Sequence, residues 1–184
     1  MKTTGDVYVV SGPSGAGKGS LLERVIPTLD DIWLSVSATT RLPRAGEQDG
    51  MHYFFISNEK FDELIAMDGM LEWASVHGAR YGTMRSEVED RLKNGIDVIL
   101  EIDPQGAFQV LEKIPGARLI FIDAPSIEEL RRRLIKRGTE DEAAIQKRIA
   151  DSAEIRKHRD RYHHVIVNDE FEKAVEDLEE LLRK

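Results

Sequence analysis

The chain has 184 residues, of which 41 % are hydrophobic and 33 % are charged, a composition typical of a soluble globular protein with one domain. Its 34 acidic and 26 basic residues give a net charge of −8, which argues against broad affinity for nucleic acids or anionic membranes. The absence of cysteine excludes a disulfide framework, a thiolate metal site and a cysteine nucleophile.

Four short runs rich in Val, Ile and Leu predict strands that are buried on both faces, as in a parallel sheet. Helical patterns follow three of these runs, and an amphipathic helix that includes Phe171 and Leu182 closes the chain. This alternation predicts an α/β fold with a doubly wound parallel sheet flanked by helices and joined by right-handed crossovers. The strands are expected at Val7–Ser11, Val98–Ile102, Leu119–Asp123 and Val165–Val167, and the first three helices at Lys18–Leu29, Pro104–Lys113 and Ser126–Lys136.

Two segments interrupt this rhythm and are predicted to be insertions into the core. From Ser37 to about Asn94 the pattern is irregular and more polar, and the stretches HYFFI and LEWASV suggest antiparallel strands. From about Ile127 to Arg159 the chain is helical and dense in arginine.

A glycine-rich turn, GPSGAGK from Gly12 to Lys18, stands between the first strand and the first helix. The spacing matches the G-x-x-x-x-G-K part of the phosphate-binding loop, in which backbone N–H groups and the helix N-terminus cradle an anion. Lys18 is then expected to reach the β- and γ-phosphates of a nucleoside triphosphate. Gly19 stands where the motif has Ser or Thr, so Ser20 is the candidate magnesium ligand, either directly or through water. An ordinary glycine-rich turn is the less favoured alternative.

A second phosphate site is suggested by Arg41 and Arg44, which lie three residues apart with Pro43 between them. Guanidinium groups suit a phosphate, and the hydroxyl groups of Tyr53 and Tyr81 would add donors. By themselves, these arginines are equally well explained as solvated surface charges.

The stretches SGPSGAGKGS, SATTRLPRAGEQDGMHY, LEWASVHGARYGT, ILEIDPQG, KRGTEDEAAIQKR and VIVND, taken in order, resemble the guanylate kinase family. The resemblance covers one domain from about residue 5 to residue 183, and it implies transfer of a phosphoryl group from ATP to GMP with Mg²⁺ as cofactor. It implies a P-loop core at 1–36, 97–126 and 160–184, a GMP-binding insertion at 37–96 and a helical lid at 127–159.

The resemblance also implies roles for individual residues of the acceptor site. Ser37, Glu72 and Thr83 match positions that read the guanine base, and a carboxylate at Glu72 suits the N–H donors at N1 and at the exocyclic amino group of guanine. Taken alone, Glu72 would be assigned to a strand surface. The remaining acceptor-site positions are Arg41, Arg44, Glu47, Tyr53 and Tyr81 at the phosphate, with Glu101 and Asp103 at the end of a strand. Those two acids could instead order water around the metal, or Asp103 could cap the next helix.

For the donor site, the resemblance implies that Arg137 and Arg148 stabilise the transferring group, with Arg133 beside ATP and Asn168 near its adenine. Lys18, Arg44, Arg137 and Arg148 are therefore the expected catalytic residues. Arg131 and Arg132 are expected to face solvent or pair with Glu128 and Glu129. The ATP-binding set also includes the whole loop: Gly12, Pro13, Ser14, Gly15, Ala16, Gly17, Lys18, Gly19 and Ser20.

Two other functions remain open at this level. Guanylate-kinase-like domains also occur as protein-binding modules without catalysis, and a related P-loop kinase could use another phosphorylated acceptor. ATP and GMP are the expected partners, with no nucleic acid or membrane. The apolar runs are too short to cross a bilayer and MKTTGD lacks the apolar part of a signal peptide, so the expected location is the cytoplasm.

Overall fold

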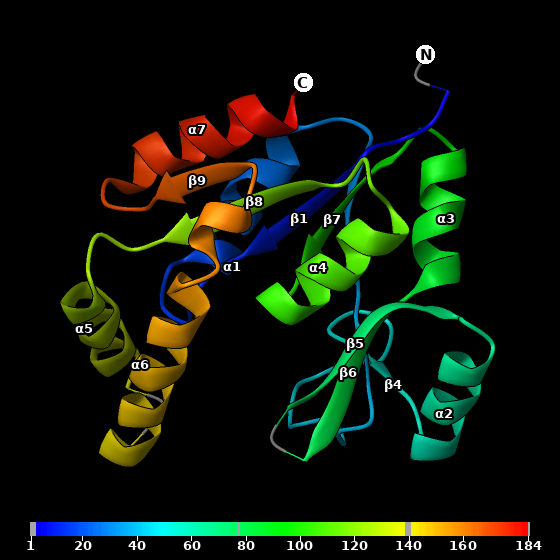
Figure 1. Ribbon diagram of the computed structural model, residues 1–184, viewed down its shortest axis with the longest axis horizontal. Helices are drawn as coiled ribbons and strands as arrows, with labels where there is room; N and C mark the ends of the chain where they lie inside the picture. Colours follow the sequence, from blue (N-terminus) through cyan, green and yellow to red (C-terminus); the bar gives the residue numbers. More distant parts are fainter. Residues whose placement is uncertain (1–2, 77, 139–140, 184) are drawn as a thin grey trace. The chain divides into compact units, whose positions relative to one another are not determined.

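The computed structural model describes residues 3–76, 78–138 and 141–183 (Figure 1). A five-stranded sheet has the order β2–β7–β1–β8–β9, and the pairs β2–β7, β1–β8 and β8–β9 are parallel. This arrangement of a parallel sheet and helices confirms the predicted α/β class. The five strands are β1 (Val7–Ser11), β2 (Ile32–Leu34), β7 (Asp97–Glu101), β8 (Arg118–Asp123) and β9 (His164–Val167).

The chain forms two compact units, which are described separately. The first, here called unit 1, comprises residues 1–7, 31–100 and 105–117. The second, called the phosphate-loop unit, comprises residues 8–30, 101–104 and 118–184.

The phosphate-loop unit is built around β1 and β8, whose central residues are fully buried. Burial on both faces explains why these strands are almost continuous runs of Val, Ile, Leu and Phe rather than alternating patterns. Helix α7 buries Ala174, Leu178 and Leu182 and packs against α1. The helices of this unit are α1 (Lys18–Val25), the 3₁₀ helix η1 (Ile26–Thr28), α5 (Ile127–Arg137), α6 (Glu142–Arg156), the 3₁₀ helix η2 (Arg159–Arg161) and α7 (Phe171–Leu182).

Unit 1 contains a second, four-stranded sheet with the order β4–β3–β6–β5. Phe61 and Met70 are buried beneath it with Ala38, and Phe54 and Leu64 pack against them. These elements are β3 (Ala38–Thr39), β4 (Phe54–Phe55), β5 (Met70–Val76), β6 (Ala79–Met84), α2 (Asn58–Ala66), α3 (Arg85–Lys93) and α4 (Pro104–Lys113).

The predicted element boundaries are largely confirmed, and the differences have local causes. The first helix was expected to reach Leu29, but α1 ends at Val25 and a 3₁₀ turn follows, because Pro27 lacks the N–H that an α-helix needs. LEWASV forms an antiparallel pair with β6, as expected. The prediction for HYFFI was wrong in part, since only Phe54–Phe55 is a strand and it pairs in parallel with β3.

Polar caps fix the start of three helices. Ser57 accepts a hydrogen bond from the amide of Lys60 at α2, Ser126 caps α5 and Asp141 caps α6 in the same way. In the part of the chain that the structure describes, no helix has the length and apolar character needed to cross a membrane.

Candidate functional site

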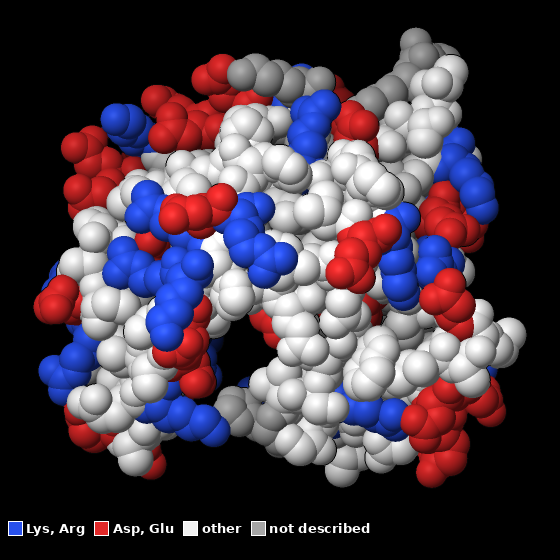
Figure 2. All heavy atoms as spheres, in the orientation of Figure 1, with Lys and Arg blue, Asp and Glu red and all other residues white. Residues whose placement is uncertain are grey.

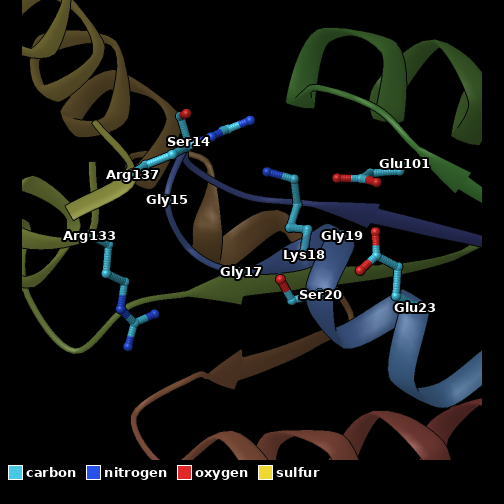
Figure 3. A pocket seen from close by; sticks show the side chains of 10 residues that line it. All are labelled: Ser14, Gly15, Gly17, Lys18, Gly19, Ser20, Glu23, Glu101, Arg133 and Arg137. Atoms are coloured by element: carbon cyan, nitrogen blue, oxygen red, sulfur yellow. The ribbon is translucent and has the colours of Figure 1, made fainter. Parts of the chain in front are cut away.

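The glycine-rich loop lies between β1 and α1 and lines a cleft of about 640 Å³ in the phosphate-loop unit (Figure 3). This volume falls within the range typical of small-molecule sites. Gly12 has a φ of +144° and lies so close to the carbonyl of Ile122 that a β-carbon would be 1.9 Å from its oxygen. The loop therefore needs glycine to pass this strand. The residues that line the cleft are Ser14, Gly15, Gly17, Lys18, Gly19, Ser20, Glu23, Glu101, Arg133 and Arg137.

Lys18 lines this cleft beside two arginines, and its ammonium group is held by the loop itself. Nζ donates hydrogen bonds to the carbonyl oxygens of Gly12 at 2.8 Å and Pro13 at 3.2 Å. Burial lowers the pKa of Lys18, and the negative charge of Glu101 opposes this effect. Burial likewise raises the pKa of Glu101, opposed by Lys18 and reinforced by Glu23, although part of the Glu101 side chain remains open to solvent. The Glu101 carboxylate points toward the Lys18 side chain in the cleft (Figure 3).

The arginines of the predicted lid lie on α5 and α6, where acidic and basic side chains are interspersed (Figure 2). Arg137 lines the cleft, and Arg148 donates a hydrogen bond of 2.7 Å to the hydroxyl oxygen of Ser14 in the phosphate loop. Arg132 pairs with Glu129, as predicted, whereas Arg131 pairs with Glu142 rather than with Glu128 or Glu129.

The Arg133 guanidinium is engaged by other groups of the protein. Its Nε forms an ion pair with Glu129, and its Nη2 donates to the carbonyl of Asn168 at 2.8 Å. The side chain of Asn168 is buried and donates to the carbonyl of Ala16 at 2.8 Å. Arg133 and Asn168 thus brace the phosphate loop from α5 and from the loop after β9. Asn168 does not cap the helix that follows, because Glu170 is the N-cap residue of α7.

The contact between Asn168 and the phosphate loop can be tested by substituting Gly17. It has a φ of +93°, and a β-carbon there would lie 2.4 Å from Nδ2 of Asn168. The Gly17→Ala variant is expected to lose roughly 1–3 kcal/mol of unfolding free energy, as is typical of a non-glycine residue forced into such a backbone conformation, and to bind ATP more weakly. Urea unfolding and ATP titration measure the two effects. Gly116→Ala is the matched control, because nothing lies within 4 Å of its β-carbon position, and equal losses in both variants would contradict the prediction.

In unit 1, a carboxylate organises the two arginines predicted to bind phosphate. Nη1 and Nη2 of Arg41 each donate to Glu47 at 2.9 Å, and the backbone amide of Arg44 donates to the same carboxylate at 2.7 Å. Hydrogen bonds from Arg41 and the Arg44 amide lower the pKa of Glu47 to about 2, and Glu47 in turn raises the pKa of Arg41. The Arg44 side chain is exposed.

Aromatic rings complete this cluster. The Arg41 guanidinium lies 5.4 Å from the centroid of the Tyr53 ring, in a cation–π contact. Tyr53 and Tyr81 meet edge to face with their centroids 5.9 Å apart. The structure therefore brings together Arg41, Glu47, Tyr53 and Tyr81, as the sequence predicts, with the Arg44 backbone tied to the same group.

Glu72 and Thr83 form a buried polar pair on the adjacent strands β5 and β6. They are 4 % and 1 % exposed, and the Thr83 hydroxyl donates to Glu72 Oε1 at 2.7 Å. An ionised carboxylate is costly to bury unless polar groups compensate its charge, and the Thr83 hydroxyl is one such group. The alternative in which Glu72 is a surface residue on a strand edge does not hold, because the residue is buried. Ser37 is half-buried just before β3, and Asp103 is exposed between β7 and α4.

Sequence reasoning missed one residue of the cleft and one ion pair that supports it. Glu23 lines the cleft from α1, and its place one helical turn after Gly19 on the same helix was the available signal. Glu129 was expected to pair with Arg132, but its second contact, with Arg133, was not predicted. Among the residues that the structure describes, no group of three or more His, Cys, Asp or Glu side chains is placed to hold a metal ion by itself.

Comparison with known proteins identifies the family. The model of the guanylate kinase family matches residues 4–184. The guanylate kinase of Synechococcus sp. (strain CC9311) is 50 % identical over 93 % of this chain and 90 % of its own length. The guanylate kinase of Escherichia coli (strain K12) is 48 % identical over 97 % of this chain and 87 % of its own.

Solved structures agree with this result. A crystal structure of guanylate kinase from Anaplasma phagocytophilum matches with a TM-score of 0.77 and 36 % identity, over 99 % of this chain and 86 % of that one. TT1252 from Thermus thermophilus matches with a TM-score of 0.55 at 12 % identity, which shows a shared fold only. With a family model that spans almost the whole chain and relatives about half identical, this protein belongs to the guanylate kinase family.

Proposed function

We propose that the protein transfers the γ-phosphoryl group of ATP to GMP, giving ADP and GDP. Membership of the guanylate kinase family supports this reaction, and the buried Glu72–Thr83 pair is the observation that carries the choice of acceptor. A carboxylate accepts hydrogen bonds from both N–H donors of guanine, whereas adenine has no hydrogen at N1 and would leave the carboxylate partly unpaired.

The donor site is assigned to the phosphate loop and the arginines of the proposed lid. Backbone N–H groups of the loop and the N-terminus of α1 hold the phosphates of ATP, and Lys18 supplies a point charge at the β- and γ-phosphates. Arg137 and Arg148 neutralise charge on the transferring group. Arg133 and Asn168 support the loop through hydrogen bonds that end at the Ala16 carbonyl. No covalent intermediate is required, because positioning and charge neutralisation carry this type of reaction.

The acceptor site is assigned to the GMP-binding insertion at 37–96. Arg41 and Arg44, with Tyr53 and Tyr81, bind the phosphate of GMP. Glu47 keeps the Arg41 guanidinium in one orientation, so less side-chain entropy is lost when the phosphate binds. Ser37, Glu72 and Thr83 read the base, and Glu101 and Asp103 complete the proposed set.

Mg²⁺ is the proposed cofactor, and the chemistry of the cleft fits it. The Ser20 hydroxyl and the carboxylates of Glu23 and Glu101 line one cleft, and oxygen donors of this kind suit Mg²⁺, which keeps several of its waters. Ser20, Glu23 and Glu101 would hold the ion, directly or through water, and its charge would offset that of the phosphates. The cytoplasm is the proposed location.

The alternative of a protein-binding module without catalysis is less well supported. A module that has lost catalysis has no need of a complete phosphate loop, a lysine in the cleft and arginines placed on that loop. The remaining alternative, another phosphorylated acceptor, conflicts with the buried carboxylate at Glu72.

An acceptor panel tests the proposal directly. ADP release from ATP and Mg²⁺ is measured with GMP, dGMP, AMP, UMP or a sugar phosphate, and GMP is expected to exceed AMP and UMP by at least ~10³-fold in kcat/KM. Equal rates with AMP, or no ADP release with any acceptor, would refute the assignment.

A further inference from the structure

β5, the strand that carries Glu72, has a neighbouring strand on one side only. β5 is the edge strand of the order β4–β3–β6–β5 and pairs with β6. The register of this pair shifts between Met70 and Glu72, and three successive residues, Met70, Leu71 and Glu72, are buried. A register shift of this kind interrupts the alternation of side chains between the two faces of the strand. An edge strand is paired on one side only, so fewer hydrogen bonds fix its register. Glu72 therefore depends on support from outside the sheet.

Side chains of α4 provide that support at the free edge of β5. The Gln109 amide accepts a hydrogen bond from the Trp73 backbone N–H at 3.1 Å and donates one to the Trp73 carbonyl at 3.0 Å. One helical turn later, Nζ of Lys113 donates to the Met70 carbonyl at 2.7 Å and pairs with Asp68. These groups are the partners that a neighbouring strand would supply, and they lie on both sides of Glu72.

We propose that Gln109, assisted by Lys113, is a positioning residue that sets how the Glu72 carboxylate meets the acceptor base. This inference rests on the proposed function of the site as a GMP site. Glu72 is fixed from one side by Thr83 and from the other by the backbone at Trp73, whose N–H and carbonyl are both bound by one amide. Two simultaneous hydrogen bonds to a base demand a fixed carboxylate, since small misplacements are costly in a dry site.

The consequence is a defined loss of selectivity. Guanine offers two donors to the carboxylate, while hypoxanthine, which lacks the 2-amino group, offers only N1–H. A loosened Glu72 can still make one hydrogen bond but makes the second one poorly. Selectivity for GMP over inosine monophosphate is therefore the property that Gln109 controls.

The test compares Gln109→Leu with Glu112→Leu, which replaces an exposed polar side chain of the same helix. In Gln109→Leu, the ratio of kcat/KM for GMP to that for inosine monophosphate is expected to fall about tenfold, through a higher KM for GMP. KM for ATP is expected to stay at the wild-type value. Glu112→Leu is expected to retain the wild-type ratio. An unchanged ratio in Gln109→Leu overturns the proposal.

A second variant covers the case in which Gln109→Leu does not fold. In Gln109→Glu the carboxylate still accepts from the Trp73 N–H but cannot donate to its carbonyl, so an intermediate fall of about threefold is expected. The Gln109→Leu and Glu72→Gln changes should also be combined, because a residue that acts through Glu72 has no further effect on the ratio once Glu72 is replaced. A full tenfold effect in that background overturns the proposal. If the wild-type protein does not phosphorylate GMP at all, the proposed function fails instead.

Discussion

Replacing Lys18 with methionine is expected to lower kcat for GMP phosphorylation by about 10³-fold, the scale seen when a charge-stabilising donor is removed from a preorganised site. Methionine matches the length of the lysine stem but carries no charge at the β- and γ-phosphates. Binding of ATP is expected to weaken less than kcat falls, because the loop amides still hold the phosphates. Steady-state kinetics with GMP and ATP, together with titration of an ATP analogue, separate the two effects.

The local environment of Lys18 makes this variant informative. The ammonium already lies against the Gly12 and Pro13 carbonyls and beside Glu101, so it is placed before ATP arrives and loses little freedom on binding. Lys93→Met, on the exposed face of α3, is the matched control and should retain wild-type kinetics. A Lys18→Met protein that folds and keeps kcat within threefold of the wild type would show that Lys18 is not part of the reaction.

The parts of the site that the sequence predicts are those built from contiguous residues. The phosphate loop is one segment whose glycines, lysine and following helix are fixed by local geometry, so its position between β1 and α1 follows from the pattern alone. The buried strands of the parallel sheet are recognisable for the same reason. Pro27 stands in the 3₁₀ turn after α1, so the early end of this helix was also predictable from the sequence.

What the sequence does not show is the pairing of distant side chains. Arg133 and Asn168 meet at the carbonyl of Ala16, and Gln109 meets Trp73 across 36 residues of chain. No periodicity marks such contacts, because each depends on the fold that brings the partners together. The strand β3 was not predicted, and β4 was predicted to be longer and antiparallel. Strands of two residues are too short to give an alternating pattern.

The Glu72→Gln variant is expected to lower kcat/KM for GMP by about 10³-fold while ATP binding is unchanged. The change is isosteric, and the amide oxygen can still accept from the Thr83 hydroxyl. The amide nitrogen, however, would then face the N–H donors of guanine, and two donors cannot satisfy each other in a buried site. Kinetics with GMP and AMP, and titration with ATP, measure the effect.

The stability of this variant separates loss of recognition from loss of structure. A carboxylate with 4 % exposure is costly to bury, so its replacement by a neutral amide is expected to leave the melting temperature of the ligand-free protein at or above the wild-type value. Glu63→Gln, on the exposed surface of α2, should alter neither property. This result would show that Glu72 serves recognition of the base and lowers the stability of the ligand-free protein. A Glu72→Gln protein that melts well below the wild type, or that phosphorylates GMP at the wild-type rate, would show that the carboxylate serves the fold instead.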